Sequence, residues 1–142
     1  MNVYLLDTNI ISEPTKPSPN LEVVQKIAEN IDYSCISAIN YAEGLSGIKN
    51  LEDGKRKDSL LSYYINDVQK LYPIIPFDSF SASIYSDIVN RLKEKGKTAP
   101  KLDTMIASVA ISNNLILVTR NTSDFINIAE VSNLMLENWF ES

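Results

Sequence analysis

The chain has 142 residues, of which 44% are apolar and 22% charged, a balance typical of a globular domain rather than a disordered segment. It carries 13 lysine and arginine residues against 18 aspartate and glutamate residues, for a net charge of −5, and it has no histidine. The absence of histidine excludes Ser-His-Asp and Cys-His catalysis, histidine zinc sites and a histidine general base.

Cysteine content and hydropathy further limit the kinds of site and the cellular compartment that the sequence allows. The single cysteine, Cys35, excludes an internal disulfide and a thiolate metal cluster, and indicates a reducing, cytosolic compartment. The N-terminus has no basic region and carries Asp7, so we do not expect a signal peptide. Aliphatic runs such as residues 115–118 are much shorter than the roughly 20 residues of a membrane span. We expect one domain over residues 1–142 with no membrane segment.

Strand and helix patterns alternate along the chain. In chain order the sequence predicts a strand at 3–6, a helix at about 20–30, a strand at 33–36, helices at about 37–48 and 58–71, a strand at 74–75, helices at 79–95 and 101–113, and strands at 115–118 and 134–136. The strands are short apolar runs without alternation, typical of strands that are buried on both faces. This order predicts an α/β sandwich around a mostly parallel sheet.

Several helix ends carry capping signals. Ser18 is expected to cap the helix at 20–30, with Pro19 at its first position. Ser37 and Asp78 are expected to cap the helices that follow them, and Gly96 to end the helix at 79–95.

Four acidic residues fall near the carboxyl ends of predicted strands. Asp7 directly follows the first strand, and Glu43 lies in the second turn of the helix after the second strand. Asp103 begins the helix before the fourth strand, and Asp124 follows that strand. Carboxylates that meet at one sheet edge cannot all ionise without a cation, and a hard ion such as Mg²⁺ prefers oxygen ligands. This combination therefore indicates a metal-assisted phosphodiesterase site.

Each acidic residue also has a purely structural interpretation. Asp7 suits the cap of a short segment at 9–12, and Asp103 suits an N-cap. Asp124 stands in ordinary turn chemistry, whereas Glu43 has semi-buried neighbours and would be costly to bury unpaired. The individual signals are weak, and their combination carries the argument.

Four segments in the expected order resemble the PIN-domain ribonucleases. They are YLLDTNIISEP (4–14), YAEG (41–44), DTMIASVA (103–110) and LVTRNTSDF (117–125). More narrowly, they resemble the VapC-type toxins of bacterial toxin–antitoxin pairs, including the FitB-like branch. The resemblance implies a three-layer α/β/α sandwich with about five short strands. It also implies Mg²⁺- or Mn²⁺-dependent cleavage of RNA, inhibition by a cognate antitoxin, and a homodimer.

The resemblance assigns roles to particular residues. Asp7, Glu43 and Asp103 match the three acidic positions of the family, and Asp124 matches the acid of its NTxDF ending. Some relatives carry that acid where this chain has Asn121, so Asn121 is a possible supporting residue. By the same resemblance, Asp7 and Asp103 bind the metal, Glu43 binds metal or deprotonates the attacking water, and Asp124 completes the set. Thr8 and Thr119 are expected to assist through their hydroxyls.

Basic residues provide candidate contacts for RNA. Nine of the 13 lie in two stretches: Lys49, Lys55, Arg56 and Lys57, then Arg91, Lys93, Lys95, Lys97 and Lys101. They could contact phosphates, although for most of them a solvated surface is the simpler interpretation. Arg120, beside the predicted site, is the best single candidate for substrate or phosphate contact.

Three functional hypotheses follow. The first is a metal-dependent endoribonuclease toxin. The second is a catalytically weak PIN-like module that binds RNA or protein. The third, a phosphatase or receiver-like phospho-acceptor, is disfavoured because Thr119-Arg120-Asn121 stands where such folds need a lysine at a strand end.

Overall fold

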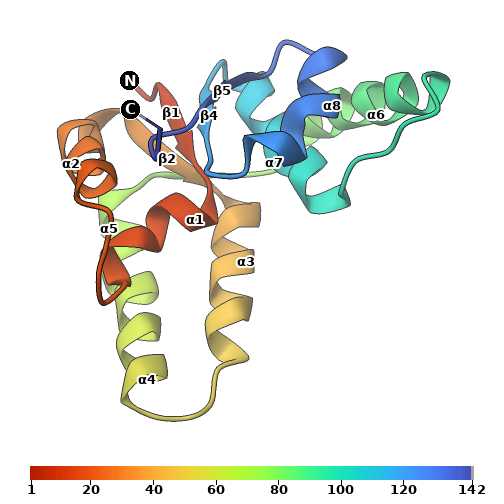
Figure 1. Cartoon of the computed structure of the whole chain (residues 1–142). Coiled ribbons are helices and arrows are strands. Elements are labelled where there is room, and N and C mark those ends of the chain that lie inside the picture. The colour runs from red at the N-terminus through yellow and green to blue at the C-terminus, as the bar shows by residue number, and fades with distance from the viewer. Residues whose placement is uncertain (142) are drawn as a thin grey trace.

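A five-stranded, fully parallel sheet forms the centre of the protein, in the order β3-β2-β1-β4-β5 (Figure 1). The computed structural model describes residues 1–141. The strands are β1 (Tyr4–Leu6), β2 (Ser34–Ser37), β3 (Ile74–Ile75), β4 (Ile116–Val118) and β5 (Met135–Glu137). All five predicted strands are confirmed, with boundaries that differ by at most one residue.

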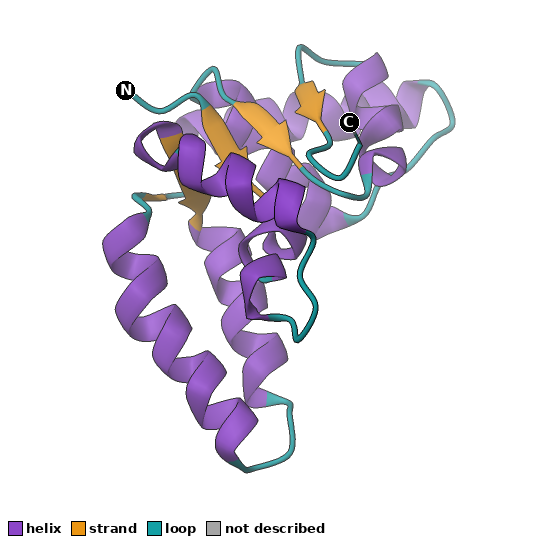
Figure 2. Ribbon diagram, turned by 60° about the vertical axis from the view of Figure 1, so that its left-hand side comes forward, coloured by secondary structure: helices purple, strands orange, loops and turns teal. Residues whose placement is uncertain are grey.

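Helices cover both faces of this sheet (Figure 2). They are α1 (Thr8–Ile11), α2 (Leu21–Glu29), α3 (Ala38–Lys49), α4 (Lys55–Ser62), α5 (Gln69–Leu71), α6 (Ser79–Glu94), α7 (Lys101–Ser112) and α8 (Ile126–Glu130). Short 3₁₀ turns lie at η1 (Glu13–Thr15), η2 (Ile31–Tyr33) and η4 (Thr122–Phe125), and a π-helical segment at η3 (Tyr63–Val68). The predicted three-layer α/β/α sandwich is confirmed. None of the helices in residues 1–141 has the length and apolar character required to cross a lipid bilayer.

Two apolar cores explain why the strands lack polar alternation. Successive strand residues point to opposite faces. Leu5 and its neighbour Leu117 pack against α6, α7 and α8, whereas Leu6 and its neighbour Val118 pack against α1, α2 and η3. Both faces of the central strands are therefore buried, as in other parallel sheets.

Most of the predicted caps are confirmed, and one is wrong. The Ser37 and Asp78 side chains accept hydrogen bonds from Asn40 N and Ser81 N at the starts of α3 and α6. For α2 the cap is Asn20, not Ser18, because the Asn20 side chain accepts from the backbone at Glu22 (3.0 Å) and Val23 (3.2 Å). Pro19 consequently lies before the cap rather than in the first turn, and the helix begins at Leu21.

A long helical hairpin extends away from the carboxyl edge of the sheet (Figures 1 and 2). One arm is α3, and the other is α4, η3 and α5 in continuous succession. The second arm starts three residues earlier than predicted and contains the unpredicted π-helical segment η3. The arms meet closely where Tyr64 packs against Gly44, at which any Cβ atom would clash with the tyrosine ring. This contact places η3 beside the helical turn that carries Glu43.

The strand order also locates the candidate site. The chain progresses from β1 to β2 and β3 on one side and to β4 and β5 on the other, so the order reverses at β1 and β4. Sites in open parallel sheets form beyond the carboxyl ends of strands at such a reversal. Asp7 and Thr119 directly follow the two strands that meet there.

Candidate active site

Asp7 is the most firmly held acidic residue of the site. It is buried, and its Oδ1 accepts hydrogen bonds from Thr8 N (2.8 Å) and Asn40 Nδ2 (2.9 Å). Its Oδ2 accepts one from the buried Thr119 hydroxyl (2.8 Å). The structural interpretation of Asp7 is also correct, since its side chain caps α1. The cap uses Oδ1, whereas Oδ2 accepts, besides the Thr119 bond, only a long hydrogen bond from Asn9 Nδ2 (3.5 Å), so Oδ2 is the oxygen more open to a cation.

Asn40 and Asn9 complete this arrangement, and the sequence analysis missed both. Asn40 is fully buried in the first turn of α3, where its side-chain oxygen accepts from the Ser37 hydroxyl (2.6 Å) while its amide donates to Asp7. Asn9 donates to Thr119 Oγ1 (3.4 Å) and accepts from Arg120 N (3.1 Å). The position of Asn40 just beyond β2 was a usable signal, but only acidic residues were sought there.

Glu43 lies one helical turn after Asn40, near enough to Asp7 and Asp103 for their charges to act on it. Its pKa is raised above the usual glutamate range, first by burial and then by the negative charges of Asp7 and Asp103. The repulsion shows that α3 directs Glu43 toward the same region as β1 and α7. No cation of the protein lowers the pKa of Glu43 in residues 1–141.

Asp103 and Asp124 form the other side of the site. Burial, followed by repulsion from Asp7 and Asp124, raises the pKa of Asp103 to about 6. Asp103 lies in the first turn of α7 and is not its cap, because that position belongs to Pro100. Asp124 is exposed in η4. The charge of Asp7 thus acts on both Glu43 and Asp103, and the charge of Asp124 acts on Asp103.

The donor set fits a hydrated hard cation. Within the described chain, no three acidic side chains come together as a compact ligand set. Mg²⁺ is commonly held by one or two carboxylates and keeps several of its waters, so a spread set of carboxylates suffices. A cation would also relieve the repulsion that raises the pKa values of Glu43 and Asp103.

The four predicted supporting residues, Thr8, Thr119, Arg120 and Asn121, differ in burial and in hydrogen-bond partners. Thr119 orients Asp7 and also accepts from the backbone N–H of Asn121 (3.1 Å), whereas the Asn121 residue itself is exposed. The Thr8 hydroxyl is buried and has no hydrogen-bond partner among residues 1–141. Arg120 lies with its guanidinium 4.5 Å from the centre of the Phe140 ring.

Arg120 interacts with the C-terminal segment and with the first loop rather than with the four acidic residues. Its charge helps to lower the pKa of the buried Glu13, after the larger effects of Lys16 and the Asn20 backbone. The pKa values of Glu43 and Asp103 show no such effect of Arg120. A role of Arg120 in substrate contact therefore stays a prediction.

Comparisons with known proteins agree with this architecture. The family model described as the PIN domain matches residues 4–131. Toxin FitB of Neisseria gonorrhoeae is 38% identical over 126 residues, covering 87% of this chain and 91% of FitB. Ribonuclease VapC2 of Rickettsia felis is 32% identical over 142 residues, covering 96% of this chain and 98% of the relative.

Solved structures give the same result. The crystal structure of FitAcB from Neisseria gonorrhoeae has a TM-score of 0.88 and 33% identity, with 99% of this chain and 100% of that chain covered. VapBC2 from Rickettsia felis, bound to a DNA fragment from its promoter, has a TM-score of 0.78 and 27% identity, with 96% and 98% covered. From its sequence, its parallel sheet and the acidic edge of that sheet, the chain belongs to the PIN-domain family.

Proposed function

We propose that this protein is a divalent-metal-dependent endoribonuclease and the toxin of a toxin–antitoxin pair. The observation that carries the proposal is the acidic edge of the sheet, where Asp7, Glu43 and Asp103 influence one another and Asp124 adds to the repulsion at Asp103. The similarity to a protein named ribonuclease VapC2 and to one named toxin FitB supports this assignment.

The proposed chemistry is attack of water on an RNA phosphodiester. Bound Mg²⁺ or Mn²⁺ would lower the pKa of water and stabilise the negative charge that develops on the phosphate. Asp7, Glu43, Asp103 and Asp124 are the residues proposed to hold the ion, in part through its bound waters, because no three acidic side chains of residues 1–141 form a compact group. Asp7 is oriented for this by Asn40 and Thr119. Glu43 is the proposed base for the attacking water, because its raised pKa makes it a better proton acceptor than an ordinary glutamate.

A cognate antitoxin is the proposed protein partner. The solved structures of FitAB and VapBC2, which are similar to this one, are both bound to a DNA fragment. The acidic edge suits an arginine or lysine from a partner peptide, which would compete with the metal. We also propose a homodimer, a single domain over residues 1–142, and a cytoplasmic location. The location is consistent with Cys35, a buried thiol whose pKa is raised by burial to about 12 and which is therefore poorly reactive.

Cleavage of RNA in vitro tests the catalytic part of the proposal. We expect the purified protein to cleave RNA with Mg²⁺ or Mn²⁺, and EDTA or Asp7→Asn to abolish cleavage. Asp87→Asn, which removes an exposed acid of α6, is the matched control and is expected to leave cleavage unchanged. Failure to cleave diverse RNAs would favour the PIN-like binding module instead.

Mixing the protein with its co-encoded partner tests the toxin assignment. We expect a stable complex on size-exclusion chromatography, with RNA cleavage suppressed in proportion to the bound partner. A partner that neither binds nor inhibits would contradict the toxin assignment while leaving the nuclease assignment intact.

A further inference from the structure

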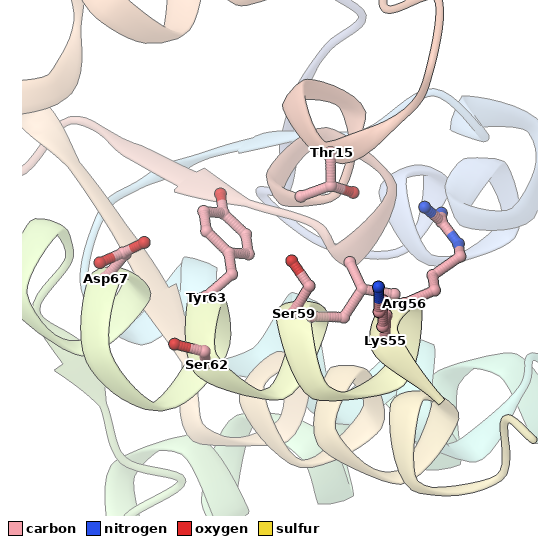
Figure 3. Close-up of a pocket in the computed structure, with 8 residues that line it drawn as sticks. Thr15, Lys55, Arg56, Ser59, Ser62, Tyr63 and Asp67 are labelled. Atoms are coloured by element: carbon pink, nitrogen blue, oxygen red, sulfur yellow. The ribbon is translucent and has the colours of Figure 1, made fainter. Parts of the chain in front are cut away.

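A groove runs between the segment around η1 (Glu13–Thr15) and the second arm of the helical hairpin, α4 and η3. It consists of two adjoining cavities, of about 290 and 690 Å³, that share Thr15, Arg56 and Leu60. The smaller cavity reaches the acidic edge, since Glu43 and Thr8 line it. The larger one lies between η1 and α4 (Figure 3). The groove therefore connects the candidate active site with the surface of α4.

At its inner end the groove has apolar residues and glycines together with Thr8, Glu43 and Tyr64 in its lining. The Thr8 and Tyr64 hydroxyls are buried there, and neither has a hydrogen-bond partner among residues 1–141. Tyr64 is only 2% exposed, and burial raises its pKa to about 12, so its hydroxyl keeps its proton. A buried hydroxyl without a partner costs about 1–3 kcal/mol. The two hydroxyls are thus unpaired polar groups in the wall of the cavity that Glu43 also lines.

The outer end of the groove is cationic. Lys55 and Arg56 lie together at one end of the larger cavity, with the Ser59 and Thr15 side chains near its middle, while Asp67 lies at the opposite end (Figure 3). Arg56 also lines the smaller cavity, so the cationic end is the one that joins the acidic site.

Lys55 and Arg56 differ from neighbouring basic residues because no acidic side chain of the described residues pairs with them. In the described part of the chain neither of them forms a salt bridge, whereas Lys16 pairs with Glu13 at 2.8 Å and Lys57 with Asp53 at 3.0 Å. The charges of Lys55 and Arg56 are therefore free to meet an anion that enters the groove.

The second basic stretch, residues 91–101, does not provide cations beside the acidic site in the same way. Arg91 and Lys95 line a separate cavity together with Glu94 and Glu130. Arg91 donates to the Val131 carbonyl (3.0 Å), and Lys97 pairs with Glu130 at 3.1 Å. Lys93, Lys97 and Lys101 line a further cavity that includes Thr104 but none of the four acidic residues. Of the two basic stretches, only the first lines a cavity that includes one of them, Glu43.

We propose that this groove binds the RNA backbone beside the cleaved bond, with Lys55, Arg56, Ser59 and Thr15 contacting its phosphates. The inference rests on the proposed ribonuclease function and deepens it. A chain of net charge −5 with an acidic active site repels RNA, so binding requires local cations close to that site. Hydroxyls and unpaired cations in one groove supply phosphate contacts in a row that leads to the carboxylates.

The test compares the salt dependence of RNA binding in matched double variants. Fluorescence anisotropy with a short, labelled single-stranded RNA is measured over a series of salt concentrations in the Asp7→Asn background. Each phosphate contact contributes about 0.7 to the slope of log affinity against log salt on single strands. Lys55→Gln with Arg56→Gln should weaken binding and reduce the slope by about 1.4. The control, Lys93→Gln with Lys95→Gln, removes the same charge from α6 and its end and should leave the slope unchanged.

Binding and cleavage separate this inference from the function on which it rests. A wild type that binds RNA with the predicted slope but never cleaves it would refute the nuclease and retain the groove. Equal slopes in the two double variants would overturn the groove, even if the wild type cleaves RNA. Unchanged RNA binding with weaker binding of the antitoxin would also overturn it, because the groove would then be a protein-docking surface.

Discussion

Asn40 orients the carboxylate of Asp7, as residues that hydrogen-bond to metal ligands do in many metal sites. The Asn40 amide is itself held in place by a hydrogen bond from the Ser37 hydroxyl. Asn40→Ala is expected to lower Mn²⁺ affinity and RNA cleavage by about 10–100-fold, since such partners typically contribute that much. Calorimetric titration with Mn²⁺ measures the affinity. Asn66→Ala, which changes an exposed amide of η3, is the control and should leave both quantities unchanged. Equal effects of the two substitutions would contradict this role for Asn40.

Asp103 should make stability depend on pH in a direction opposite to that of most acidic residues. Its folded pKa of about 6 exceeds its usual value of 3.8, so the folded state holds the proton more tightly and ionisation destabilises it. Asp103→Asn should therefore raise the free energy of unfolding of the metal-free protein above about pH 6. This gain should shrink as pH falls from about 6 to about 4 and vanish below that range. Urea unfolding of both proteins in EDTA measures it, and a pH-independent difference would refute the assignment.

At this scale the sequence indicated the four acidic residues and the supporting hydroxyl of Thr119, but not the amides of Asn40 and Asn9. Asp7 directly follows a predicted strand, whereas the choice of Glu43, Asp103 and Asp124 rested on the combination of the four and on the family resemblance. The contact between Asn40 and Asp7 joins residues that are 33 positions apart, and the packing of Arg120 on Phe140 depends on where the C-terminal segment folds. Such contacts depend on tertiary structure, so a residue type and its spacing do not determine them.

The helical hairpin depends on one close contact between its arms. A Cβ atom at Gly44 would clash with the Tyr64 ring, whereas a Cβ atom at Gly47, on the same helix, would meet nothing within 4 Å. Gly44→Ala should thus cost about 1–3 kcal/mol in the free energy of unfolding, as overpacked sites do. Gly47→Ala should instead gain about 0.5–1 kcal/mol from helix propensity. Chemical denaturation measures both, and a Gly44→Ala protein as stable as the wild type would show that Tyr64 can move aside.

Element types were easier to predict than element ends. The strands and long helices follow from apolar patterns, which the two cores require. The start of α2 was wrong because Ser18 and Asn20 both suit a cap, and tertiary contacts decided between them. Glu13 accepts a hydrogen bond from Asn20 N (2.9 Å), which fixes Asn20 at the helix start. The π-helical turn at η3 likewise has no signal in the apolar spacing of 58–71.

The whole molecule is expected to unfold as one unit. Trp139 is the single tryptophan and is 3% exposed, with its ring edge-on to Tyr4 and the centroids 5.3 Å apart. It therefore reports on the core formed by α1, α2 and η3. Unfolding followed by tryptophan fluorescence should coincide with unfolding followed by far-ultraviolet circular dichroism, as for a two-state domain. Two separate midpoints would contradict a single domain over residues 1–142.

The charge of the whole chain agrees with catalysis by carboxylates and metal alone. The chain has no histidine, and four of its 18 acidic residues are assigned to one cation site. The bound ion would offset much of the repulsion between those carboxylates and a phosphodiester. The remaining requirement is a local cationic surface, which the groove beside α4 supplies.

Restoration of activity by metal is the most direct test of this account. Protein freed of metal with EDTA is given RNA in ¹⁸O-labelled water, and the cleavage rate is followed as Mg²⁺ or Mn²⁺ is added back. We predict no cleavage before addition, a saturable rise in the wild type, no rise in Asp7→Asn, and solvent ¹⁸O in the terminal phosphate of the product. Cleavage that persists in EDTA and in Asp7→Asn, or a cyclic phosphate product without solvent oxygen, would contradict it.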